Sequence, residues 1–307
     1  MSAEPRIAVL ISTYNGEAFL RRQLDSIAAQ EGVSAEVFAR DDGSTDGTLA
    51  ILRDYAGLWP SLTAPLVGER LGPASSFLTL LGSVPPAFDG FAFCDQDDVW
   101  MPDKLSRAAL RLDETVDRPA LYCSAVMCVD SNLRALGPKS VNGDTRFVHL
   151  LFENMAYGNT VVMNARAHAA ITARPPQNGV IMHDWWCALV VSAVGQVIFD
   201  PRPGVLYRQH GANAIGASPR RWSELSSIAR RLWRQPREVY PIHDQAQEFL
   251  RLFEDQLDPE RLECARALVQ SRRSLAARVA FAAGAEIPRS DFIGALAARL
   301  LIAAGIY

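Results

Sequence analysis

Three carboxylates lie within four positions of the stretch "FCDQDDVW", residues 93–100: Asp95, Asp97 and Asp98. Apolar residues flank them on both sides. Like charges this close raise one another's pKa unless a positive group intervenes. A solvated turn would explain the stretch. A divalent cation would also explain it, because Mg²⁺ takes oxygen ligands and is commonly held by one or two carboxylates together with substrate phosphates.

Strands and helices alternate around this acidic stretch. Apolar runs rich in branched residues predict strands at "RIAVLIST", "AEVFARD", "FAFC" and "PALYCSAVMCV". Between them, apolar residues recur at helical spacing, at Phe19, Leu20, Leu24 and Ile27 and again at Leu49, Ile51 and Leu52. Ser44, Thr45 or Asp46 would cap the second helix. The alternation predicts an α/β fold, with a mostly parallel central sheet flanked by helices.

Polar loops follow three of the predicted strands: "STYNGE", "DDGSTDG" and "CDQDD". In α/β sheets, ligands bind beyond the carboxyl ends of the strands. The glycine-rich dinucleotide fingerprint and the GxxxxGK[ST] phosphate loop are both absent from the sequence. A diphosphate bound at this edge would therefore need a cation, which gives "DQDD" a role.

Composition limits the classes of function. The chain of 307 residues is 49% hydrophobic and carries a net charge of -3, which argues against a nucleic-acid partner. We find no signal peptide and no apolar run of the roughly 18 residues that a membrane span needs. The five cysteines match no zinc pattern and predict buried, reduced thiols. These features predict a cytoplasmic protein.

Helical patterns without a convincing strand continue from about Ser218 onward. Residues 220–238 contain six arginines, two glutamates, Trp222 and Trp233. A solvated helix face explains this stretch as well as peripheral contact with the inner face of the cell membrane does, since basic faces with Trp favour anionic headgroups. The apolar C-terminal stretch "SDFIGALAARLLIAAGIY" is compatible with either interpretation.

Six motifs together resemble a known family. "VLISTYNGEAFLRRQLDSI", "DDGSTDGT" and "FCDQDDVWMPDKL" resemble the donor-binding half of family 2 glycosyltransferases, which have a GT-A type fold. "GNTVVMN", "HDWW" and "YRQHGANAIG" are similar to the bacterial rhamnosyltransferase branch. The resemblance spans about residues 5–216. It implies a GT-A domain over residues 1–217, with a nucleotide-sugar half to about residue 130 and an acceptor half over about 131–217, and a helical C-terminal extension over 218–307.

The resemblance also implies roles on the donor side. Asp97 would bind the metal, and Asp95 would bind the ribose or reach the metal through water. His210 matches a histidine that helps to bind metal or diphosphate in some relatives. The remaining donor-binding candidates are Thr13 and Tyr14 in the base pocket, Asn15 beside them, Asp42 as acceptor of the pyrimidine ring N–H, and Arg208 as a phosphate contact.

On the acceptor side, Asp184 falls where the family carries its general base. The residue before it is His183, where most members have Glu. Trp185, Trp186 and Asn159 would line the acceptor site. Simpler interpretations remain for several of these residues: a turn cap for Asp42, a helix cap for Asp98, an orienting role for His183, and core packing for the two tryptophans and His210.

The resemblance implies an inverting, metal-dependent hexosyltransferase that adds one sugar. It would use Mg²⁺ or Mn²⁺ and a dTDP- or UDP-sugar, with dTDP-L-rhamnose favoured. The acceptor would be a glycan or lipid-linked precursor of a bacterial surface polysaccharide. A sugar nucleotidyltransferase is the first alternative, although it should show a glycine-rich loop with Arg or Lys after the first strand. A non-catalytic nucleotide-sugar-binding protein is the second. A glycosidase is disfavoured, because nothing indicates an opposed carboxylate pair.

Overall fold

The computed structural model describes residues 3–139, 143–210, 241–284 and 299. Its contacts divide the chain into two compact units. The first comprises Met1–Thr145, Asn154–Pro175 and Met182–Arg208, and the second comprises Arg146–Glu153, Pro176–Ile181 and Gln209–Tyr307. The predicted boundary after residue 217 therefore falls nine residues later than the boundary of the first unit after Arg208. Two short segments from earlier in the chain also join the second unit.

The helices and strands of the first unit are β1 (Arg6–Thr13), α1 (Leu20–Ala28), β2 (Ser34–Asp41), α2 (Thr48–Leu58), β3 (Leu66–Val67), α3 (Pro73–Ser83), β4 (Gly90–Cys94), β5 (Val99–Trp100), α4 (Lys104–Asp113), β6 (Ala120–Val129), β7 (Ala135–Lys139), the 3-10 helix η1 (Gly158–Thr160), β8 (Val162–Asn164), α6 (Ala165–Thr172), α7 (His183–Val194) and β9 (Gln196–Arg208). Those of the second are α5 (Phe147–Phe152), α9 (Ile242–Phe253), the 3-10 helix η2 (Glu254–Gln256), α10 (Pro259–Ser271) and α11 (Leu275–Gly284).

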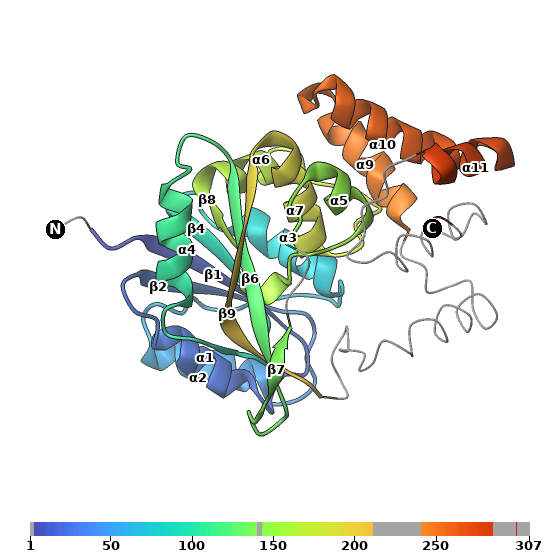
Figure 1. The fold of residues 1–307 in the computed structure, drawn as a ribbon. Coiled ribbons are helices and arrows are strands. Elements are labelled where there is room, and N and C mark those ends of the chain that lie inside the picture. Colours follow the sequence, from blue (N-terminus) through green and yellow to red (C-terminus); the bar gives the residue numbers. More distant parts are fainter. Residues whose placement is uncertain (1–2, 140–142, 211–240, 285–298, 300–307) are drawn as a thin grey trace. The chain divides into compact units, whose positions relative to one another are not determined.

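One sheet with the strand order β3-β2-β1-β4-β8-β6-β9-β5 forms the centre of the first unit, and β7 pairs with β6 (Figure 1). The N-terminal strands β3, β2, β1 and β4 are parallel to one another. Beyond β4 the sheet is mixed: β8 is antiparallel to β4 and β6, whereas β9 is parallel to β6. The predicted α/β sheet flanked by helices is confirmed, and its parallel part is the N-terminal half.

Helices cover both faces of the sheet (Figure 1). Ile7, Val9 and Ile11 of β1 share a buried cluster with Leu24 of α1 and Leu105 of α4. The alternate residues of the strand face the side covered by α3, α6 and α7. Both faces of β1 are therefore buried, which explains why its sequence is a continuous apolar run.

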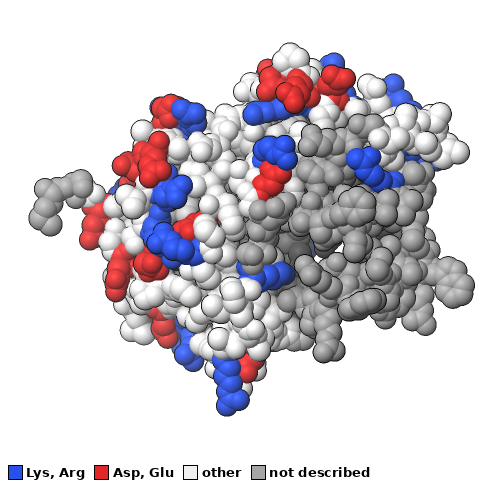
Figure 2. Space-filling model, in the orientation of Figure 1, with Lys and Arg blue, Asp and Glu red and all other residues white. Residues whose placement is uncertain are grey.

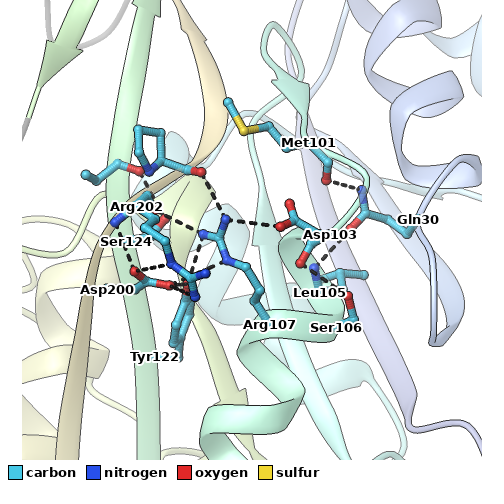
Figure 3. Close-up of polar contacts among 12 residues, drawn as sticks. Gln30, Met101, Asp103, Leu105, Ser106, Arg107, Tyr122, Ser124, Asp200 and Arg202 are labelled. Atoms are coloured by element: carbon cyan, nitrogen blue, oxygen red, sulfur yellow. Dashed lines mark hydrogen bonds and ion pairs between the residues drawn. The ribbon is translucent and has the colours of Figure 1, made fainter.

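Polar contacts fix α4 on the sheet near the acidic stretch (Figure 3). Arg107 of α4 forms an ion pair with buried Asp200 of β9, at 3.5 Å between Nε and Oδ2, and donates to the hydroxyl of Tyr122 of β6 at 3.3 Å. The Tyr122 hydroxyl donates to Asp200 at 2.9 Å. At the start of the helix, Gln30 donates to the carbonyl of Met101 at 2.8 Å and accepts from the amide of Leu105 at 3.0 Å.

Lys104, the first residue of α4, is fully buried, and its ammonium lies 3.7 Å from the centroid of the Trp100 ring. Burial lowers the pKa of Lys104 to about 7. The lowered pKa shows that the contact with the ring does not make up for the hydration that the ammonium loses.

The second unit, in its described part, is helical. Phe147 of α5 packs against Phe249 of α9, with ring centroids 5.5 Å apart, and Glu248 forms an ion pair with Arg251 at 2.7 Å. The predicted helical character is confirmed for α9, α10 and α11. Residues 220–238 and most of the apolar C-terminal stretch lie outside the described residues.

Charges of both signs are mixed over the described surface in Figure 2. None of the described helices has the length and apolar character that crossing a membrane requires. The cysteines carry free thiols, and Cys94, Cys123, Cys128 and Cys187 are buried as predicted.

Candidate active site

The carboxyl ends of β1, β2 and β4 meet at one edge of the sheet. Thr13 lies opposite Asp41 in the β1–β2 register, and Ile11 lies opposite Cys94 in the β1–β4 register. The three predicted loops therefore begin side by side. This edge is where open α/β sheets bind ligands.

Hydrogen bonds connect the first loop to the second. The backbone amide of Asn15 donates to Ser44 Oγ at 2.9 Å, and the Asn15 side chain accepts from the Thr45 amide at 2.8 Å. Asn15 has a positive φ of 49°, a conformation that Asn tolerates better than most residues. The N-cap of α2 is Gly47, so the prediction that Ser44, Thr45 or Asp46 caps this helix is wrong. Asp46, the residue before the cap, accepts a hydrogen bond from the Thr48 amide at 3.0 Å.

Thr13 and Tyr14 belong to the first of these loops, at the end of β1. The Arg70 guanidinium lies 4.1 Å from the centroid of the Tyr14 ring, on the loop between β3 and α3. The hydroxyl of buried Thr13 donates to Asp41 at 3.0 Å. A planar cation stacked on a half-buried aromatic ring is a fitting neighbour for a nucleotide base. Arg70 lies in none of the motifs that the sequence indicated.

Asp42 is buried, and both of its carboxylate oxygens accept hydrogen bonds. Oδ1 accepts from the Leu71 amide and Oδ2 from the Gly72 amide, each at 2.8 Å, and Arg40 pairs with Oδ1. Burial opposes the charge of Asp42, but these hydrogen bonds outweigh it and lower the pKa. In this structure Asp42 shapes the loop that carries Arg70. Its hydrogen bond to a pyrimidine ring remains a prediction.

The acidic turn after β4 contains carboxylates in two kinds of surroundings. Asp95 and Asp97 are half-buried, whereas Asp98 is fully buried. Burial and the neighbouring charges of Asp98, Asp97 and Asp184 hold the pKa of Asp95 well above its usual range. Burial and Asp97 likewise raise the pKa of Asp98 to about 8, against the effect of its hydrogen bonds.

Two elements far away in sequence bind Asp98. The side chain of Asn159 in η1 donates to Asp98 Oδ2, and the Arg208 amide at the end of β9 donates to Oδ1 at 2.9 Å. Asp98 is thus the carboxylate that attaches the turn to the rest of the unit. The predicted acceptor residue Asn159 is 1% exposed and serves this attachment.

Arg208, predicted as a phosphate contact, is buried at the end of β9. Its Nε donates to the carbonyl of Asp97 at 2.7 Å, and its guanidinium lies 4.7 Å from the centroid of the Phe19 ring. It binds the backbone of the acidic turn, and a phosphate contact remains a prediction. His210 follows two residues later, in the second unit, and its metal-binding role also remains a prediction.

Asp184 lies in the first turn of α7 and is 6% exposed. It accepts hydrogen bonds from the Trp185 and Gly158 amides and from the Asn154 side chain. Burial nevertheless raises the pKa of Asp184 to about 6. Its charge is close enough to raise the pKa of Asp95, so the structure brings the predicted base toward the acidic turn.

His183 packs among aromatic rings. It stacks on Phe77 with ring centroids 4.0 Å apart and meets Phe93 edge-on at 4.7 Å. Neither ring nitrogen has a hydrogen-bond partner within the described residues, and burial lowers the pKa of His183 to about 3. A neutral ring in these surroundings holds the start of α7 by packing. The neighbouring Trp185 and Trp186 are 4% and 0% exposed, which favours core packing over an acceptor platform.

No group of three or more metal-ligating side chains forms within the described residues. The acidic turn still fits a divalent cation. Asp95 and Asp97 are half-buried and their charges repel, and a cation would relieve that repulsion. Mg²⁺ needs only one or two protein carboxylates when substrate phosphates complete its shell.

An α/β sheet with polar and acidic loops beyond the carboxyl ends of its parallel strands is typical of nucleotide-binding enzymes. Sequence comparison specifies the family. The profile of "Glycosyl transferase family 2" matches residues 8–173. The chain belongs to this family and is a glycosyltransferase.

Individual relatives agree with this assignment. The dTDP-rhamnosyl transferase RfbG of Shigella flexneri is 30% identical over 224 residues, which are 68% of this chain and 74% of the relative. Among solved structures, S. aureus TarS 1-349 in complex with UDP-GlcNAc matches with a TM-score of 0.55 at 18% identity, over 98% of this chain and 88% of TarS. The mannosyltransferase PcManGT from Pyrobaculum calidifontis, in complex with GDP-Man and Mn2+, has a TM-score of 0.52 at 20% identity, over 99% and 87%. These structures share the GT-A fold.

Proposed function

We propose that this chain is an inverting, metal-dependent glycosyltransferase that transfers L-rhamnose from dTDP-L-rhamnose to a glycan or lipid-linked acceptor of a bacterial surface polysaccharide. The observation that carries the reaction type is the buried carboxylate Asp184, with a pKa of about 6, beside the acidic turn. The similarity to RfbG supports the donor, and UDP-sugars are the second choice. Family membership favours a transferase over a sugar nucleotidyltransferase.

The donor side is formed by the three loops at the sheet edge. Tyr14 with Arg70 would receive the base, and Asp95 and Asp97 would hold Mg²⁺ or Mn²⁺ against the diphosphate. The cation would offset charge that grows on the leaving group. The structure of PcManGT, which was solved with GDP-Man and Mn2+, is a precedent within this fold.

Asp184 would take the proton from the acceptor hydroxyl as that oxygen attacks the anomeric carbon. A base must be ionised at working pH yet basic enough to accept the proton, and a pKa of about 6 meets both conditions. Attack on the face opposite the leaving diphosphate inverts the anomeric centre. The apolar packing of His183 against Phe77 and Phe93 would keep the Asp184 carboxylate in place.

Thermal unfolding of the full chain with a panel of nucleotide sugars, each with and without Mn²⁺, tests the donor. A ligand at a hundred times its Kd stabilises a fold by about 2.7 kcal/mol. We expect dTDP-L-rhamnose with Mn²⁺ to give the largest shift. Stabilisation by UDP-sugars alone would assign a UDP-sugar as the donor and leave the reaction class unchanged. Stabilisation by none of the nucleotide sugars would contradict the proposal.

A further inference from the structure

Gln96, the residue between Asp95 and Asp97, binds the backbone of Tyr14 at two points. Its Oε1 accepts from the Tyr14 amide and its Nε2 donates to the Tyr14 carbonyl, each at 2.9 Å. The side-chain amide thus satisfies both backbone groups of the residue that stacks with Arg70.

This contact extends the pairing of β1 with β4 beyond its end. The parallel register of the two strands stops at Ile11 opposite Cys94. Tyr14 and Gln96 follow, and the primary amide of Gln96 supplies the donor and the acceptor that a further peptide group would have supplied. The sheet edge is therefore continued by a side chain at the point where the acidic turn begins.

The loop after β1 fits closely around this amide. A Cβ atom placed on Gly16 would lie 2.2 Å from Gln96 Oε1, so any larger residue there would require the Gln96 amide to shift. The Gly16 amide donates to Thr48 Oγ1 at 2.8 Å, which fixes the loop from the other side. Glycine at position 16 therefore leaves the space in which the Gln96 amide can bind Tyr14.

The acidic turn is attached on its other side to β9 and η1. Arg208 Nε donates to the Asp97 carbonyl at 2.7 Å, and Asn159 donates to Asp98. Arg208 also packs against the Phe19 ring, at the far end of the loop that contains Tyr14, with 4.7 Å between the guanidinium and the ring centroid. The two hydrogen bonds of Gln96 join the turn to the backbone of Tyr14 itself.

We propose that Gln96 is a positioning residue that couples cation binding at the acidic turn to base binding at Tyr14. This inference rests on the proposed function, in which both ends of one nucleotide contact these two loops. Because Gln96 links the turn to Tyr14, it would keep a cation on Asp97 and a base on Tyr14 at a fixed separation from each other. Such coupling is reciprocal between the two ligands.

Gln30 offers a matched control. Its amide also binds backbone in another segment at two points, donating to the Met101 carbonyl at 2.8 Å and accepting from the Leu105 amide at 3.0 Å (Figure 3). It makes a further, longer hydrogen bond to the carbonyl of Ser26 at the end of α1, at 3.2 Å. The chemistry and the distances are alike, but Gln30 connects the end of α1 to the start of α4. Replacing either glutamine with Met keeps the length of the side chain and removes all of its hydrogen bonds to backbone.

The experiment measures the Kd of dTDP and UDP by calorimetry, with and without Mn²⁺, for the wild-type full chain and for Gln96→Met, Gln96→Asn and Gln30→Met. The readout is the factor by which Mn²⁺ lowers the nucleotide Kd. We expect this factor to fall about tenfold in both Gln96 variants, a size typical of coupled sites. It should stay at the wild-type value in Gln30→Met, even where urea unfolding shows that variant to be equally destabilised.

An unchanged Mn²⁺ factor in Gln96→Met, or an equal loss in Gln30→Met, would overturn the coupling and leave the proposed function intact. If the wild-type chain itself shows no effect of Mn²⁺ on nucleotide binding, the metal-dependent function fails and the coupling fails with it. Gln96→Asn, which is too short to reach both Tyr14 groups, provides the same test if the Met variant does not fold.

Discussion

Carboxylates in two regions of the site lie in opposite surroundings. At the sheet edge, Asp42 and Asp46 accept hydrogen bonds from backbone amides, which lower their pKa values although burial opposes this. At the start of α7, burial dominates and raises the pKa of Asp184 to about 6. Carboxylates of the first kind stay ionised and shape loops. A carboxylate of the second kind can exchange a proton near neutral pH, which general-base catalysis requires.

The difference extends to what fixes each region. The loops of the donor side are connected by hydrogen bonds such as those of Asn15 and Gln96. The start of α7 is held mainly by aromatic packing around His183. Substitutions in the donor loops should therefore change the affinity for the donor, whereas substitutions at the start of α7 should change the catalytic rate.

Asp97→Asn should have the largest effect, because it removes the charge that would hold the cation on the donor side. We expect metal-dependent donor binding to disappear and turnover to fall by about three decades or more, as several kcal/mol of charge stabilisation are lost. Calorimetry and initial rates measure the two quantities. Near-normal turnover of this variant in EDTA would show that the metal assignment is wrong.

Asp184→Asn should reduce the rate and spare the donor. The amide keeps the shape of the side chain and loses its basicity, so kcat should fall by roughly two to four decades. The donor Kd should stay close to wild type, because a base acts on the acceptor hydroxyl. Lost donor binding with a normal rate at saturation would move Asp184 to the donor side and remove the contrast between the two regions.

The pH dependence of Asp184 gives a third prediction. Below a pKa of about 6 the base is protonated, so kcat/KM of the wild type should fall about tenfold per pH unit.

The raised pKa also affects stability: the contribution of Asp184 is favourable below its unfolded pKa and is lost as pH rises through the folded value. At pH 7.5 the free energy of unfolding of Asp184→Asn should therefore exceed that of the wild type by about 1 to 3 kcal/mol.

Urea unfolding of the two proteins at pH 4 and pH 7.5 measures that stability difference. The advantage of Asp184→Asn should shrink or vanish at the lower pH, where wild-type Asp184 is already protonated. A stabilisation that is independent of pH would assign the effect to hydrogen bonding and leave the raised pKa without support.

His183→Phe should have the smallest effect of the four. Phe keeps the aromatic packing against Phe77 and Phe93, and His183 is neutral at working pH because burial lowers its pKa to about 3. We expect kcat within about fivefold of wild type, since packing changes of similar volume are well tolerated. A loss of kcat greater than that of Asp184→Asn would make the histidine the base.

The sequence by itself determined much of the N-terminal half. The buried strand over Arg6–Thr13 and the helix with Leu20, Leu24 and Ile27 are confirmed. So is the meeting of three polar loops at one sheet edge. These features depend on the spacing of hydrophobic residues along short segments, which the local sequence specifies. They depend also on the alternation of strands and helices, which is typical of a parallel sheet. The acidic turn and the family followed from the same local patterns.

Other features were decided by the tertiary structure. The sequence did not predict β9 as a strand, because Pro201 and Pro203 interrupt it; in the fold both lie where the register between β6 and β9 shifts. Asn159 holds Asp98 across 61 positions and Arg208 holds it across 110. Gln96 reaches Tyr14 across 82. No local pattern encodes such partners, since each hydrogen bond exists only after the sheet has brought distant loops to one edge.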